Sequence, residues 1–172
     1  MDARDLFLFE HALAQSAAVG GNKTSAAENT FRGVTDEQMR MRPREDLNSL
    51  AWLMWHIARA EDIMVNAVLI GRDQVLDGSW RSRLRVARKD FGIGMTKAEV
   101  SEVTGQIDIG ALRENRDAVG RRTRDIVSGF GAADWQGEVT SSACGQRRPR
   151  TPSARSPNSS SRSGSVGHAS PS

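Results

Sequence analysis

Residues 48–70, NSLAWLMWHIARAEDIMVNAVLI, carry the strongest helical pattern in the chain. Asn48 or Ser49 can cap the start of a helix, and Gly71 can end it. We therefore expect a bundle helix of about six turns over residues 49–70, with Arg59, Glu61, Asp62 and Asn66 largely outside its apolar face. That face repeats at intervals of three and four residues, as one side of a helix does, and consists of Trp52, Leu53, His56, Ala60, Ile63 and Ala67.

Helix signals continue on both sides of this segment. Residues 3–19 favour helix through Leu, Ala, Glu and Gln, and a last helix is expected over residues 109–129. Residues 72–95 should be irregular, with Trp80 packed down as an anchor. The expected apolar face of the first helix is Leu6, Phe9, Leu13 and Ala17. Side chains expected to cap shorter or later helices are Ser25 with Glu28, Thr35 with Gln38, Thr96 with Glu99, and Asp108.

No alternating apolar run of useful length indicates a strand. Three substantial helices with several short ones predict an all-α fold, an antiparallel helical bundle. Met39 and Met41 are expected in its core with Trp52 and Trp55. Mixed charge on the last helix predicts a solvated face. The basic residues there are Arg113, Arg116, Arg121, Arg122 and Arg124, interleaved with Glu114, Asp117 and Asp125.

The composition changes abruptly near residue 141. Residues 141–172 hold eleven Ser, four Pro and five Arg, with no acidic residue and nothing large and apolar to bury. We therefore expect two parts, a helical domain over residues 1–140 and a disordered tail over residues 141–172. The Arg, Pro, Ser, Ala and Gly bias is typical of GC-rich DNA read in a wrong frame, so we hypothesise a frameshifted C-terminus. A genuine Ser/Arg linker is the alternative.

Charge and cysteine content limit the partners and the compartment. The chain has 24 basic and 21 acidic residues, and the five tail arginines leave residues 1–140 with a net charge of −2. Basic charge confined to a tail gives the folded part no electrostatic reason to bind nucleic acid. No stretch approaches the roughly 20 apolar residues of a membrane span, and the start MDARDLFLFEHALAQ lacks the features of a secretory signal. A single Cys144, expected to be inert, fits a cytoplasmic protein.

His56 is the clearest candidate site residue. It lies four residues after Trp52 and four before Ala60, so the three side chains share one apolar side of the helix. A neutral imidazole buried there needs a hydrogen-bond partner or a metal ion, because an unpaired polar group is costly to bury. A core histidine satisfied by a carbonyl or water is the simpler interpretation, and metal ligation is the sharper one.

The runs TDEQMRMRP at 35–43 and NSLAWLMWHIARAED at 48–62 resemble the DinB/YfiT-like superfamily, which includes the N-terminal domains of mycothiol-dependent maleylpyruvate isomerases. The resemblance covers about residues 3–130. It implies a four-helix bundle in up-down-down-up order that forms a homodimer. It also implies a divalent metal, zinc or nickel, held by three histidines, one of which matches His56. Such proteins use the metal to activate a low-molecular-weight thiol for transfer or isomerisation.

The sequence departs from this pattern at the other two ligands, an H-x-x-x-H pair on a late helix. No such pair exists here, and the remaining histidines are His11, expected at a helix boundary, and His168 in the tail. The fourth helix should begin where the tail starts, so we expect it to be missing. The prediction is a metal-binding DinB-like protein whose thiol-dependent transferase or isomerase activity is impaired. The alternative is a non-catalytic dimerisation or small-ligand-binding module.

Overall fold

The computed structural model describes residues 1–137, in which the regular secondary structure is entirely helical, without a strand. Three segments form the long helices: α1 (Ala3–Ala14), α5 (Leu50–Asp62) continued by the π-helix η1 (Ile63–Ile70), and α8 (Ile109–Ser128). The all-α prediction is confirmed. The shorter elements are α2 (Ala17–Gly20), α3 (Ala26–Phe31), α4 (Asp36–Arg40), α6 (Gly78–Leu84), α7 (Lys97–Gln106) and the 3-10 turn η2 (Asp134–Gln136).

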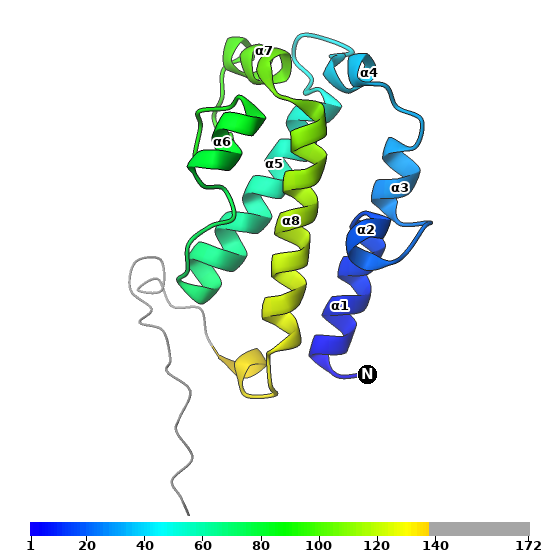
Figure 1. The fold of residues 1–172 in the computed structure, drawn as a ribbon, viewed down its shortest axis with the longest axis vertical. Helices are drawn as coiled ribbons and strands as arrows, with labels where there is room; N and C mark the ends of the chain where they lie inside the picture. Colours follow the sequence, from blue (N-terminus) through cyan, green and yellow to red (C-terminus); the bar gives the residue numbers. More distant parts are fainter. Residues whose placement is uncertain (138–172) are drawn as a thin grey trace, which may run out of the picture.

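The long helices follow the order up, down, down (Figure 1). α1 runs antiparallel to the other two, whereas α5 and α8 run in the same direction and are joined by a crossover that contains α6 and α7. This order agrees with the first three helices implied by the resemblance. The missing fourth helix and the disordered tail were predicted for residues that lie outside the described part, so both stay predictions.

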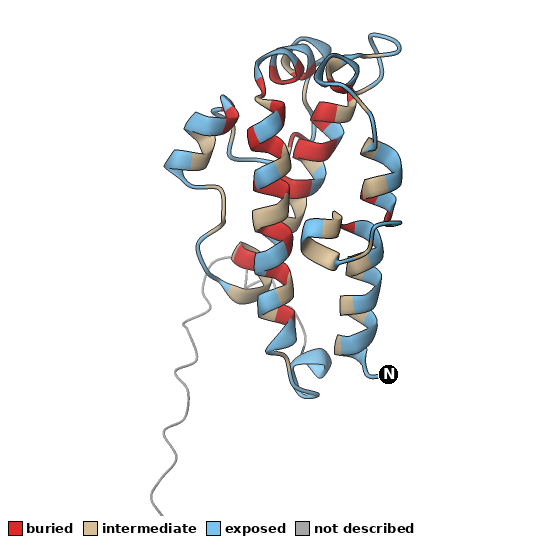
Figure 2. Ribbon diagram, turned by 45° about the vertical axis from the view of Figure 1, so that its right-hand side comes forward, coloured by how far each residue is buried: buried red, intermediate tan, exposed pale blue. Residues whose placement is uncertain are grey.

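The apolar core gathers at the end of the bundle near α4 and α7 (Figure 2). Trp55 is 1% exposed and Met39 is fully buried, so both pack as expected. Met41 is 58% exposed, so the prediction that it belongs to the core was wrong. α1 contains no fully buried residue. The other core side chains include Trp52, Met54, Leu84, Val100, Val103, Ile107 and Leu112.

Local side-chain caps explain where most helices begin. Thr35 and Thr96 form complete capping boxes with Gln38 and Glu99, as predicted. Ser25 accepts a hydrogen bond from the Glu28 amide, but the Glu28 carboxylate turns away to the Ala17 amide. The remaining predicted caps are those of Ser49 on Trp52 and Asp108 on Ala111.

Three further predictions, on the end of the first helix, on residues 72–95 and on Trp80, were wrong. The first helix ends at Ala14 and not near residue 19, because Gln15 is extended and buried in contacts with another helix. The crossover is not irregular throughout, because Asp77 caps α6 by accepting the Trp80 amide. Trp80 itself is half-buried and stacks under Arg83 at 4.3 Å instead of anchoring a core.

The predicted apolar face of α5 was also wrong. Leu53 is 38% exposed, whereas Arg59, Asp62 and Asn66 are almost completely buried. The buried side of the helix is therefore rotated toward these polar residues, which satisfy one another as described below. Gly71 ends the helix in a left-handed conformation, as predicted. No helix within residues 1–137 combines the length and apolar character that crossing a bilayer requires.

Candidate metal site at His56

The His56 ring lies between two aromatic side chains. Trp52, one turn earlier on α5, stacks on it with ring centroids 4.8 Å apart and planes inclined by 10°. The Phe91 ring lies 5.8 Å away on the loop between α6 and α7. These contacts hold a half-buried imidazole in one orientation on the helix.

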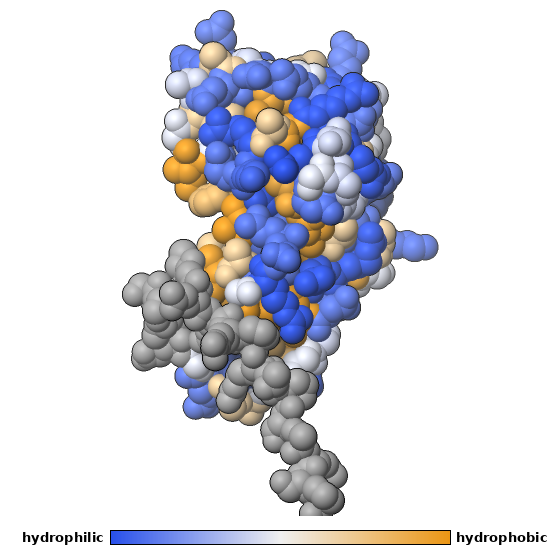
Figure 3. Space-filling model, turned by 60° about the vertical axis from the view of Figure 1, so that its left-hand side comes forward, coloured by the Kyte–Doolittle hydropathy of each residue, from blue (hydrophilic) through white to orange (hydrophobic). Residues whose placement is uncertain are grey.

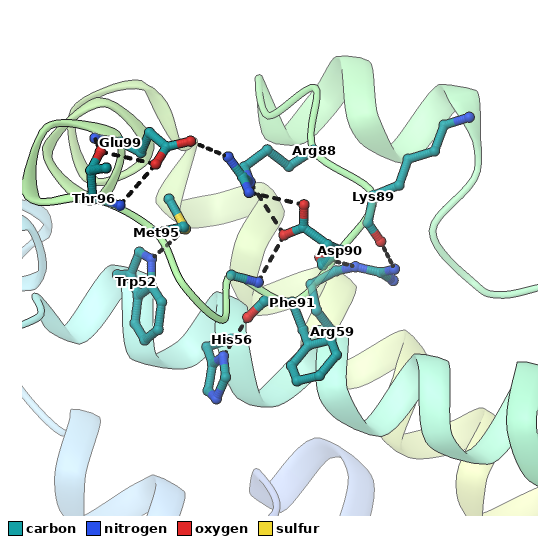
Figure 4. Close-up of polar contacts among 11 residues, drawn as sticks. Trp52, His56, Arg59, Arg88, Lys89, Asp90, Phe91, Met95, Thr96 and Glu99 are labelled. Carbon is teal, nitrogen blue, oxygen red and sulfur yellow. Dashed lines mark hydrogen bonds and ion pairs between the residues drawn. The ribbon is translucent and has the colours of Figure 1, made fainter.

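A backbone carbonyl selects the tautomer of this imidazole. His56 Nδ1 lies within hydrogen-bond distance of the Phe91 carbonyl oxygen (Figure 4). Because a carbonyl only accepts, Nδ1 carries the proton and donates. Nε2 then holds a free lone pair, points away from the loop (Figure 4), and has no hydrogen-bond partner among residues 1–137. A histidine with Nδ1 bonded to a carbonyl and Nε2 free has the form that binds metal ions.

The loop that supplies this carbonyl is fixed to α5 by Arg59. The guanidinium donates to the Lys89 carbonyl and, at 3.4 Å, to the Asp90 carbonyl (Figure 4). It also donates to the Gln74 side-chain oxygen at 2.6 Å. Arg59 therefore holds the backbone on the N-terminal side of Phe91.

Asp62 balances the buried charge of Arg59. The Arg59 Nη1 to Asp62 Oδ2 distance is 2.7 Å. The same carboxylate accepts the side-chain amide of Asn66, and two crossover amides complete its partners at 2.8 and 2.9 Å, those of Val75 and Leu76. Burial lowers the pKa of Arg59, and the Asp62 carboxylate opposes that shift. A buried ion pair with its remaining oxygens hydrogen-bonded is a tolerable arrangement in a core.

Asp90 and Gly92 shape the loop next to Phe91. Burial raises the pKa of Asp90, but hydrogen bonds from Arg88 and from the Gly92 amide outweigh it and hold the pKa below its usual range. Gly92 has a positive φ of 85°, and a Cβ there would come within 2.8 Å of the Trp55 ring. At position 92 the backbone therefore passes so close to Trp55 and Trp52 that only glycine, which has no Cβ, fits without a shift.

The described residues do not complete a metal site around His56. Within residues 1–137 no three His, Cys, Asp or Glu side chains cluster closely enough to hold an ion together. Asp62 is committed to Arg59, and Glu61 accepts from His11 Nε2 at 3.0 Å. Residues 56 and 61 project about 140° apart on a helix, so His11 lies on a different flank of α5 from His56. His168 and Cys144 lie outside the described residues.

His11 and Glu61 belong to a second polar cluster, where α1 meets α5 and α8. Gln15 donates to the other oxygen of Glu61 at 2.8 Å. Burial raises the pKa of Glu61, but its hydrogen bond with His11 and the charge of Arg116 are among the effects that outweigh it, and the pKa falls below its usual value. The carboxylate is therefore charged in the folded bundle near neutral pH.

The solvated face predicted for α8 was wrong at two arginines. Arg116 is 8% exposed and donates to the Ala14 carbonyl, and half-buried Arg124 donates to the Leu8 carbonyl. These bonds join α8 to α1 through backbone oxygens. Sequence reasoning missed these arginines, and also the Arg59 and Asp62 pair. The sequence does show Arg59 and Asp62 at i, i+3 spacing within an apolar helix. The same spacing is typical of exposed ion pairs, so it did not indicate that this pair is buried.

The fold and the oriented ring define an all-helical bundle protein with one imidazole nitrogen available at its second long helix. Comparison with protein families gives a match to the DinB superfamily over residues 23–155. The chain belongs to the DinB superfamily. No characterised protein in a curated collection matches it. The matched range continues past residue 140, where we predicted the domain to end, and that boundary stays a prediction.

Proposed function

We propose that this DinB-family protein binds a divalent metal ion, zinc or nickel, through Nε2 of His56, and that this binding is weak. The observation that carries the proposal is the tautomer: the Phe91 carbonyl occupies Nδ1 and leaves Nε2 free on a half-buried ring. Trp52 keeps that ring from turning. A carbonyl on the second ring nitrogen is the usual support of a metal-binding histidine.

The ligand set limits what such a metal could do. Catalytic zinc sites use about three protein ligands and an open position. Residues 1–137 offer His56 alone, since Glu61 and Asp62 have other partners. The residues therefore do not fit the three-histidine metal implied by the resemblance, and we propose that thiol-dependent transfer or isomerisation is impaired in this chain.

Metal titration of the full chain tests the proposal. We expect equilibrium dialysis against zinc or nickel to give binding in which His56→Ala removes most of the bound metal. His11→Gln is the matched control, because it changes a histidine of α1 that contacts another flank of α5 through Glu61. Equal metal content in the wild type and His56→Ala would refute ligation by His56. Loss of metal only in His11→Gln would place the ion at the polar cluster of His11 and Glu61.

Self-association is a second candidate function, and an outward apolar stripe favours it. Leu53, Ile57 and Met64 are 38%, 49% and 55% exposed, and their spacing puts them on one side of α5 and η1. Figure 3 shows hydrophobic patches breaking the hydrophilic surface of one face of the molecule. Apolar surface of this kind is commonly covered by another copy of the chain.

Sedimentation velocity tests the second candidate. A homodimer through this stripe should dissociate in Ile57→Glu and persist in Ile93→Glu, which changes a loop isoleucine that is 75% exposed. A wild-type chain that sediments as a monomer at all concentrations contradicts the homodimer.

A further inference from the structure

A cavity of about 420 Å³ lies between α2, α3, α5 and α8. This volume is in the range of small-molecule binding sites. Met54 contributes its wall from α5, and residues 54 and 56 project to nearly opposite sides of a helix. The cavity is therefore separate from the His56 position. Its apolar wall is formed mainly by Ala27, Phe31 and Met54.

Two arginines of α8 line this cavity with hydrogen-bonding capacity to spare. Arg116 is more than nine-tenths buried, yet its one bond runs from Nη2 to the Ala14 carbonyl at 3.2 Å. Arg113 makes a single long bond, 3.4 Å, to the Val34 carbonyl. The Nε atoms of both arginines are buried without a partner, and neither guanidinium forms an ion pair with any described residue. The Glu61 and Asp117 carboxylates act on Arg116 through their charges, but neither accepts a hydrogen bond from it. The unused N–H groups of the two guanidiniums can therefore donate to an anion in the cavity.

The acidic residues of the cavity wall already have partners. Glu28 accepts from the Ala17 amide at 2.8 Å, and Asp117 accepts from the Ser16 hydroxyl at 2.6 Å. With Arg32, the wall holds three arginines against these two carboxylates, a net charge of +1. That balance suits a ligand with a single negative charge.

We propose that this cavity binds a small organic acid, with one carboxylate and an apolar body. The carboxylate accepts hydrogen bonds from Arg113 and Arg116, the geometry for which guanidinium groups are well suited. The apolar body packs against Phe31 and Met54. This activity goes beyond the metal proposal and does not depend on it.

Calorimetric titration with phenylacetate tests the proposal on the full chain. Phenylacetamide is the neutral control of the same shape. We expect the amide to bind at least about tenfold more weakly, because hydrogen bonds between charged groups are stronger than neutral ones. Arg113→Gln should weaken phenylacetate binding by a similar factor. Arg122→Gln, an exposed position on the same helix outside the cavity wall, should leave it unchanged.

Each other outcome overturns the carboxylate site. Equal binding of phenylacetate and phenylacetamide would show that the cavity binds the apolar body and does not recognise the carboxylate. Binding of phenyl phosphate without phenylacetate would assign it to phosphate esters. Equal effects of Arg113→Gln and Arg122→Gln would place the anion elsewhere. His56→Ala should leave phenylacetate affinity intact, so failure of the metal proposal and failure of this one are distinguishable. Arg113 is half-buried, so its variant tests the site without disturbing the more buried Arg116.

Discussion

Arg59 and Asp62, one turn apart on α5, form an ion pair whose two side chains are 1% and 0% exposed. Asp62 holds the backbone before α6 through the Val75 and Leu76 amides, and Arg59 holds the backbone after α6 through the Lys89 and Asp90 carbonyls. One pair therefore fixes both ends of a segment whose next residue, Phe91, bonds to His56. The pair therefore helps to orient the loop that sets the His56 tautomer.

Removing the charge of Asp62 should destabilise the bundle strongly. Asp62→Asn leaves the Arg59 guanidinium buried without a counter-charge, and breaking one partner of a buried pair costs about 3–5 kcal/mol. Urea unfolding followed by circular dichroism measures the loss. Asp46→Asn is the control, because it removes the partner of Arg44 in an exposed pair, and should change stability little. Similar losses in the two variants would show that Asp62 is not a buried anchor.

Alanine substitutions at Gly92 and Gly94, in the same loop, distinguish backbone strain from steric overlap. Both have a positive φ, 85° and 78°, but a Cβ at Gly94 meets nothing within 4 Å. Gly94→Ala should therefore show backbone strain alone, about 1 kcal/mol. Gly92→Ala should lose more, because its Cβ also meets Trp55 and Trp52 at 2.8 and 3.0 Å. Thermal unfolding of the two variants measures the difference, and equal losses would mean that the loop moves freely off the tryptophans.

Helix starts could be predicted because a cap lies within its own few residues. Thr35, Thr96 and Asp108 each accept the backbone amide three positions later, and the sequence alone shows that spacing. The buried face of α5 could not be predicted, because the partners of Asp62 are crossover amides with no side-chain signature. The bond partner of His56 is likewise a backbone carbonyl. His56 was thus found as a residue, while the atoms that orient it were not.

Glu61 should make stability depend on pH in the acid range. Its pKa is lower in the folded chain than in the unfolded one, so its contribution is complete above the unfolded value. That contribution is lost as pH falls below about 4.5, the ordinary value for glutamate, and through the folded pKa. Urea unfolding at a series of pH values should show a shallower acid decline for Glu61→Gln than for wild type. Parallel declines would mean that Glu61 is not held charged by His11 and Arg116.

Gly120 on α8 lets α1 and α2 approach this helix closely. A Cβ there would lie 3.0 Å from Gln15 Cδ and 3.0 Å from Val19 Cγ1. Gly120→Ala should therefore destabilise the bundle by about 1–3 kcal/mol, the usual cost of overpacking, despite the better helix propensity of alanine. Gly110→Ala in the same helix is the control: it is exposed, with only Asp108 Oδ1 at 3.4 Å, and should be neutral or stabilising by up to about 1 kcal/mol. Because the Gln15 and Val19 side chains link α1 and α2 to α8, hydrogen exchange in Gly120→Ala should rise first in α1. A variant as stable as Gly110→Ala, with unchanged exchange in α1, would show that α1 does not depend on this close approach.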